Sequence, residues 1–160
     1  MQEDHDTTDK QRIVAKALIR RSDGRLLLLR RAPDPLSENA LKYNPPGGAV
    51  EVGESLAVAL RRAVLEETRL EILIGGIVGV NDWHGQYRKA YYVGIFYSCK
   101  LVNQSAEIIL NHENCEYAWV SKENLANLNI MDASRHIIER YLASTDPPQL
   151  PYQELKPQQQ

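Results

Sequence analysis

Apolar residues near the start of the chain fall in two short runs that are typical of β-strands. The first is RIVAKALI, residues 12–19, and the second is RLLLLRR, residues 25–31. Between them, Asp23 and Gly24 form a pair that favours a tight turn. Two strands joined by such a turn predict a β-hairpin.

After Ser55 the spacing of the apolar residues changes. Leu56, Leu60 and Val64 recur every four residues, which places them on one face of an α-helix. Serine commonly caps a helix N-terminus, so we expect a helix from this point to about Thr68. The apolar face of that helix is expected to pack on a sheet.

The second half of the chain returns to strand-like patterns. Residues 71–80 and 89–102 are rich in β-branched and aromatic side chains, with NDWHGQY, residues 81–87, expected as the connecting loop. EYAWV, residues 116–120, predicts a further short strand, and Asp132 is expected to cap a last helix that ends at Tyr141. This order of elements favours a mixed α/β sandwich over a regular βαβ alternation.

Length and composition indicate one compact domain. The chain has 160 residues, of which 43% are hydrophobic, enough to bury a core. Residues 1–10 are polar and unpatterned, and residues 144–160 are rich in Pro and Gln. We therefore expect a folded domain over residues 11–143 between two flexible tails.

The overall charge excludes several classes of partner. With 19 basic and 21 acidic residues, the chain has no bulk field that would hold long nucleic acid or an anionic membrane. No apolar run approaches the roughly 20 residues that span a bilayer. Cys99 and Cys115 lack the spacing of a metal site, and no signal-peptide pattern precedes them, so a cytoplasmic location is expected. Any anionic ligand must be bound locally.

Two adjacent carboxylates on the predicted helix are the main candidates for chemistry. Glu66 and Glu67 share one flank of that helix and repel each other unless a cation lies nearby. Mg²⁺ suits such oxygen ligands, and it commonly binds few protein carboxylates together with phosphate oxygens. Arg62 lies one turn earlier, where it can pair with Glu66 and orient it. A solvated charged face remains the alternative interpretation of the glutamate pair alone.

The spacing of these residues resembles a known motif. From Gly48 to Leu70 the chain carries glycine, then Glu54 after five residues, then Arg62 after seven more, followed by the glutamate pair. This pattern is similar to the Nudix box, the loop-helix motif of hydrolases that cleave a nucleoside diphosphate linked to another group. The resemblance implies a Nudix-type α/β/α sandwich with a mixed β-sheet between helices.

The resemblance also implies a set of roles. Mg²⁺ or Mn²⁺ would be held by Glu66, Glu67 and the backbone of Gly48, and Arg62 would orient a carboxylate. Glu113, which stands six residues before a tryptophan, would supply a further ligand or a general base from a loop. Water would then attack a phosphorus atom of the diphosphate bridge. Nudix proteins are often dimers, so a homodimer is possible.

Two positions depart from the box. Arg69 replaces a glycine that usually ends the helix in a left-handed conformation, and Ala63 replaces a glutamate that commonly serves as metal ligand or base. Losing a general base typically costs about 10²- to 10⁴-fold in rate. The base could instead be Glu67 or Glu113. The reaction could have moved to the sugar carbon of a nucleotide sugar, as in GDP-mannose hydrolases, with His112 as base, or the site could bind nucleotides with weak catalysis.

Three further residues are candidates for substrate binding. Arg31 ends the second predicted strand, where it could meet a phosphate or face solvent. Tyr43 precedes the Pro-Pro-Gly-Gly turn and could stack on a base, although a core position is equally compatible with an aromatic ring. Trp83 could line the substrate cleft or a subunit contact. The predicted substrate is a small nucleoside diphosphate derivative.

Overall fold

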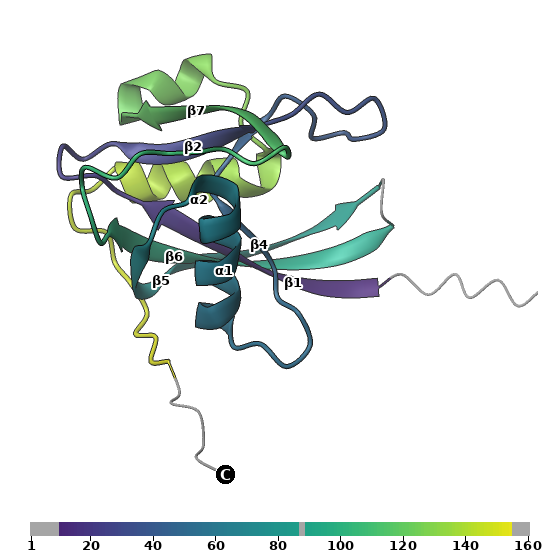
Figure 1. Cartoon of the computed structure of the whole chain (residues 1–160), viewed down its shortest axis with the longest axis horizontal. Coiled ribbons are helices and arrows are strands. Elements are labelled where there is room, and N and C mark those ends of the chain that lie inside the picture. Colours follow the sequence, from purple (N-terminus) through teal and green to yellow (C-terminus); the bar gives the residue numbers. More distant parts are fainter. Residues whose placement is uncertain (1–9, 87–88, 155–160) are drawn as a thin grey trace, which may run out of the picture.

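A computed structural model describes residues 10–86 and 89–154. No helix within these two ranges is long and apolar enough to cross a membrane. Figure 1 shows the arrangement of the elements. In chain order they are β1 (Lys10–Ile19), β2 (Leu26–Arg31), β3 (Tyr43–Asn44), β4 (Gly47–Ala49), α1 (Leu56–Thr68), β5 (Ile72–Gly85), β6 (Ala90–Leu101), β7 (Asn114–Val120), the 3₁₀ helix η1 (Lys122–Asn127) and α2 (Asp132–Leu142).

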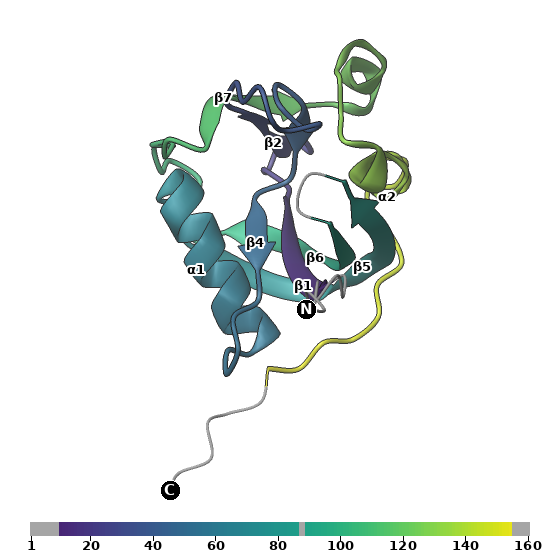
Figure 2. The same ribbon diagram turned by 90° about the vertical axis from the view of Figure 1, so that its right-hand side faces the viewer.

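The strands form two sheets between two helices. The larger sheet has the order β4-β1-β6-β5, and it is mixed because β1 runs parallel to β6 but antiparallel to β4. The smaller sheet has the order β3-β2-β7. Helix α1 lies on one side of the strands and α2 on the other, as Figure 2 shows. The predicted α/β/α sandwich with a mixed sheet is confirmed.

Two hydrophobic clusters hold these layers together. On one face of β1, Ala17 packs with Leu60 and Val64 of α1. On the opposite face, Leu18 packs with Ile138 of α2. Neighbouring residues of a strand point to opposite faces, so a continuous apolar run in β1 serves both helices.

The boundaries of the two helices follow from local chemistry. The Ser55 side chain accepts a hydrogen bond from the Val58 N–H at 3.2 Å, which confirms Ser55 as the cap of α1. Arg69 ends α1 with a φ of 62°, so arginine itself takes the left-handed conformation, at about 1 kcal/mol. At α2 the cap is Met131, and Asp132 is the first helical residue. The cap was therefore predicted one position too late, because α2 begins at Asp132 itself.

The predicted hairpin of the first two strands is wrong in its pairing. A tight turn does join them, with the Arg21 N–H donating to the Arg25 carbonyl at 2.8 Å. However, β1 belongs to the larger sheet and β2 to the smaller one. Both edges of β1 are taken by β4 and β6, which leaves no edge for β2 beyond one bridge from Arg20 to Leu26.

The segment predicted as a loop over residues 81–87 is mostly strand. β5 continues to Gly85 and pairs with β6 throughout, with Trp83 opposite Tyr92. Residue 87 lies outside the described residues. Because ladder hydrogen bonds use the backbone, polar side chains such as Asn81 and Asp82 do not prevent the strand from continuing. This extension brings Trp83 onto a regular, paired surface.

The C-terminal segment differs from the expected flexible tail. Leu150 and Ile77 exchange two backbone hydrogen bonds of 2.8 Å, and the ring of Tyr152 packs edge-on against Tyr97 with centroids 4.9 Å apart. Residues 144–154 therefore lie along the larger sheet, since the exposed edge of β5 offers free backbone groups. The other expected tail residues, 1–9 and 155–160, lie outside the described ranges.

Candidate active site

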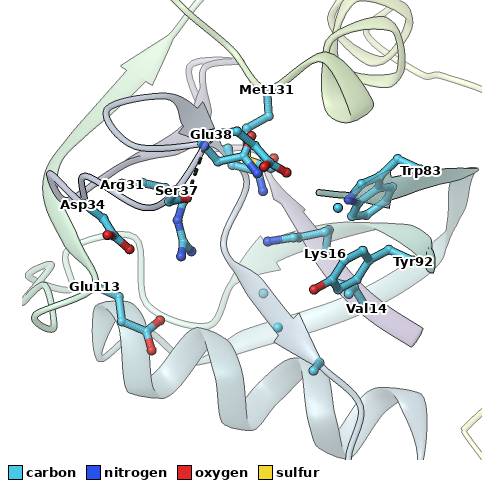
Figure 3. Close-up of a pocket in the computed structure, with 16 residues that line it drawn as sticks. Val14, Lys16, Arg31, Asp34, Ser37, Glu38, Trp83, Tyr92, Glu113 and Met131 are labelled. Carbon is cyan, nitrogen blue, oxygen red and sulfur yellow. Dashed lines mark hydrogen bonds between the residues drawn. The ribbon is translucent and has the colours of Figure 1, made fainter. Parts of the chain in front are cut away.

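A cleft of about 300 Å³ opens between the two sheets (Figure 3). Its walls come from β1, β4, the segment after β2, the β5–β6 hairpin and the residue that precedes β7. Among the lining residues are Lys16, Arg31, Gly48, Trp83, Tyr92 and Glu113. Charged and aromatic side chains that are far apart in the sequence thus share one cavity.

Gly47 is the residue that lets the walls approach each other. Its φ is 143°, and a methyl group added there would lie 2.1 Å from the Ala15 carbonyl oxygen. Any other residue would clash with the backbone of β1, so glycine is required. The Gly47 N–H also donates to Glu67 Oε1 at 3.1 Å. This bond joins the turn before α1 to the last turn of the helix.

Glu67 is fixed immediately behind this turn. Its residue is 9% exposed, and its second oxygen accepts a hydrogen bond from Asn114 Nδ2 at 3.1 Å. Burial raises the pKa of Glu67, while the charge of Lys16 and the two hydrogen bonds oppose that rise. A carboxylate held in this way has the fixed orientation that a base or a metal ligand needs, and its raised pKa suits the role of base.

Arg62 forms the predicted ion pair with Glu66 only loosely and binds a second carboxylate, Glu54, more closely. Its Nε and Nη2 atoms donate to the two oxygens of Glu54, both at 2.8 Å, and Nη2 also reaches the Ala49 carbonyl at 3.0 Å. Arg62 lowers the pKa of Glu54 to about 2. The predicted partner, Glu66, lies 3.5 Å away with a side chain that is 62% exposed. Arg62 therefore ties the loop before α1 to the helix, and Glu66 is only loosely held.

Glu113 reaches the cleft from the position just before β7. It is exposed, and its carbonyl oxygen accepts a hydrogen bond from the Ala32 N–H at 2.9 Å, which fixes it beside the segment after Arg31. Both Glu113 and Arg31 line the cleft, and their roles as metal ligand or base and as phosphate contact stay predictions. His112 is exposed and is not one of the lining side chains found within the described residues.

The three residues predicted to bind substrate lie in different places. Trp83 lines the cleft and stacks on Tyr92, with ring centroids 5.4 Å apart and planes 11° from parallel. Tyr43 is 9% exposed within the core, where the Arg30 guanidinium covers its ring, and it does not line the cleft. The core alternative for Tyr43 therefore matches its position.

Sequence reasoning missed Lys16 and Tyr92, which also line the cleft. The signal for Lys16 was present, because a lysine stands alone between apolar residues in the run VAKAL. Charged residues are almost never buried unless a partner or a function requires it. Tyr92 gave no such signal, because its place depends on the register of β5 and β6.

The donor set fits a divalent ion that takes few protein ligands. No group of three His, Cys, Asp or Glu side chains that could hold a metal occurs in residues 10–86 and 89–154. Ala63 explains part of this, since it is buried directly behind Gly48, where a methyl group added to the glycine would lie 3.2 Å from its Cβ. Mg²⁺ usually binds through one or two carboxylates plus substrate phosphates. Glu113 and Gly48 line the cleft and Glu67 is hydrogen-bonded to the Gly47 turn, so these three residues are the candidates for such a small set of ligands.

Comparison with known proteins adds an independent line of evidence. The NUDIX domain family matches residues 10–141. Nucleoside triphosphatase NudI of Salmonella agona (strain SL483) is 30% identical over 138 residues, covering 81% of this chain and 95% of that protein. The crystal structure of a MutT protein from Methanosarcina mazei Go1 is 32% identical, with a TM-score of 0.74 and coverage of 84% and 94%. A NUDIX hydrolase from Nitrosomonas europaea is 27% identical, with a TM-score of 0.69 and coverage of 87% and 93%.

Proposed function

Because this chain belongs to the NUDIX family of hydrolases, we propose that it cleaves a phosphoanhydride bond in a small nucleoside triphosphate or a related nucleoside diphosphate derivative. The relative from Salmonella, which the chain covers almost completely, is a nucleoside triphosphatase. Nudix hydrolases generally use divalent metal ions such as Mg²⁺. We extend that requirement for Mg²⁺ or Mn²⁺ to this chain.

One observation carries the proposal. A buried glutamate, Glu67, is hydrogen-bonded to the turn that lines a cleft, and the same cleft contains Glu113 and an aromatic pair at Trp83 and Tyr92. In phosphoanhydride hydrolysis, carboxylates can hold a metal ion or accept the proton of the attacking water. An aromatic surface can stack on a nucleobase. The arrangement therefore offers one region for a nucleoside and another for its phosphates.

The roles follow from burial and charge. Glu67 and Glu113, with the Gly48 backbone, would hold the metal ion, and Glu66 could add a further oxygen from the exposed flank of α1. The ion would neutralise phosphate charge and lower the pKa of a water molecule. A carboxylate oxygen of Glu67 or Glu113 that does not contact the ion would take the proton from the attacking water. Arg31 would contact a phosphate oxygen, because its side chain lines the same cleft.

The test is product analysis by mass spectrometry in ¹⁸O-labelled water. The panel would contain nucleoside triphosphates, dinucleoside polyphosphates, ADP-ribose and GDP- and UDP-sugars, each with Mg²⁺. We expect label on a product phosphate, which marks attack at phosphorus. Label on a free sugar would instead support attack at carbon, and stabilised melting without any product would support a nucleotide-binding protein.

Matched variants connect that activity to the cleft. Glu67→Gln should lower the rate by about 10²-fold or more with the fold intact. Glu71→Gln removes an equally charged but exposed side chain outside the cleft and should leave the rate unchanged. Equal activity of the two variants would remove Glu67 from the mechanism.

A further inference from the structure

Lys16 occupies an unusual place for a lysine. It lies in the middle of β1, pairs with Gly47 of β4, and is only 9% exposed. Figure 3 shows its side chain extending into the cleft, between the aromatic pair of Trp83 and Tyr92 and the carboxylate of Glu113. A buried ammonium group thus lies in the middle of the proposed substrate site.

The protein satisfies this ammonium group poorly. Among the described residues, its one hydrogen bond runs to the Pro45 carbonyl oxygen at 3.4 Å, and no carboxylate comes within 4.0 Å. An ammonium group has three donors, so most of its capacity remains unused. Burial lowers the pKa of Lys16, and the charges of Glu67 and Glu113 oppose that effect from a distance. A buried charge without close partners is costly, which points to a ligand that completes its surroundings.

We propose that Lys16 binds a phosphate group of the substrate directly. The inference deepens the proposed function and rests on it, because it assumes that phosphates enter this cleft. A phosphate oxygen would accept the two unused N–H donors and neutralise the buried charge. Lys16 stands between the surface suited to a base and the carboxylates suited to a metal ion, so it would hold phosphate that the ion does not cover. Fewer divalent ions are then required, in keeping with the missing carboxylate at Ala63.

A purely structural role for Lys16 makes a different prediction. In that case the ammonium group would serve only to offset the charge of Glu67 across the Gly47 turn. Its removal would then alter the melting temperature but leave phosphate affinity unchanged. The two roles can therefore be separated by a binding measurement that involves no catalysis.

The experiment is calorimetric titration of the full chain with inorganic tripolyphosphate in EDTA. Without metal, binding should depend on Lys16, and Lys16→Met should weaken it by about tenfold or more, because the variant loses the charge and its hydrogen bonds to phosphate. The matched control is Lys100→Met, which removes the same charge from an exposed site on β6 and should leave affinity unchanged. Lys16→Gln, which keeps a donor but not the charge, serves if the methionine variant fails to fold.

Each outcome bears on the proposal. Equal affinity of the wild type and the Lys16 variants, or no metal-free binding by the wild type, would overturn it. Labelled product without any Lys16 effect would leave the hydrolase assignment standing and reject this inference alone. Lys16-dependent binding without turnover of any nucleotide would support phosphate binding by Lys16 and reject the hydrolase assignment.

Discussion

Restoring a carboxylate at position 63 tests the central feature of this site. Ala63 is 4% exposed and lies directly behind Gly48, so glutamate at this position would place a charge in a buried space. Glu67 follows one helical turn later on the same flank, and the two carboxylates would repel each other. Without metal, Ala63→Glu should therefore lower the free energy of unfolding by about 3 kcal/mol. For a domain of this size, that loss corresponds to about 6–12 °C in melting temperature.

A divalent ion should reverse most of this loss. If the added carboxylate completes a metal site, Mg²⁺ at about 100 times its dissociation constant would return about 2.7 kcal/mol. The assay is thermal unfolding in EDTA and in a series of Mg²⁺ concentrations, with hydrolysis measured in parallel. Ala63→Gln is the matched control, because it adds the same volume without the charge and should be destabilised with little recovery in Mg²⁺.

The comparison between these two variants shows whether position 63 faces the metal region. Equal recovery of Ala63→Glu and Ala63→Gln in Mg²⁺ would refute the inference that position 63 faces the metal region. A rise in hydrolysis for Ala63→Glu alone would indicate that the present site works with an incomplete set of ligands. An unchanged rate, with recovered stability, would indicate that Glu67 or Glu113 already acts as the base.

Three further predictions concern the turn, the ion pair and the aromatic surface. Gly47→Ala should lower the free energy of unfolding by about 3 kcal/mol or more in urea denaturation, because its methyl group would meet the β1 backbone. Gly53→Ala, with a φ of 87° but open space, should cost only about 1 kcal/mol, and equal losses would contradict the steric argument. Arg62 lowers the pKa of Glu54 to about 2 in the folded protein. The ion pair therefore contributes its full stability above the unfolded pKa of Glu54, and this contribution is lost as pH falls toward the folded pKa. The stability difference between wild type and Arg62→Met, followed by denaturation at each pH, should accordingly shrink between about pH 5 and pH 2, and a difference independent of pH would argue against the ion pair. Trp83→Leu should weaken binding of a nucleoside triphosphate by about 1–3 kcal/mol while sparing tripolyphosphate, and parallel losses would exclude base stacking.

Local patterns predicted much of the fold because local interactions decide it. The four-residue repeat of Leu56, Leu60 and Val64 and the Ser55 cap define α1 within its own segment. Strand pairing is decided at long range. The first two strands look like a hairpin in the sequence, yet β1 pairs with residues about 80 positions later because β6 and β4 compete for its edges.

The same division applies to the site. The sequence by itself determined the spacing of Gly48, Glu54, Arg62, Glu66 and Glu67, since these positions lie on one loop and one helix. Only the tertiary structure decided which of them act together. It paired Arg62 with Glu54, left Glu66 exposed, and buried Glu67 against the Gly47 turn.

Lys16 and Tyr92 give the clearest case. Each lies on a strand, and the strand sequence predicts only that alternate residues face opposite sides of the sheet. Their convergence on one cleft depends on the register of β1 with Gly47 and of β5 with β6. A one-residue slip would turn either side chain to the other face of the sheet, so register, which no local pattern contains, placed the ammonium group and the aromatic pair in the cleft.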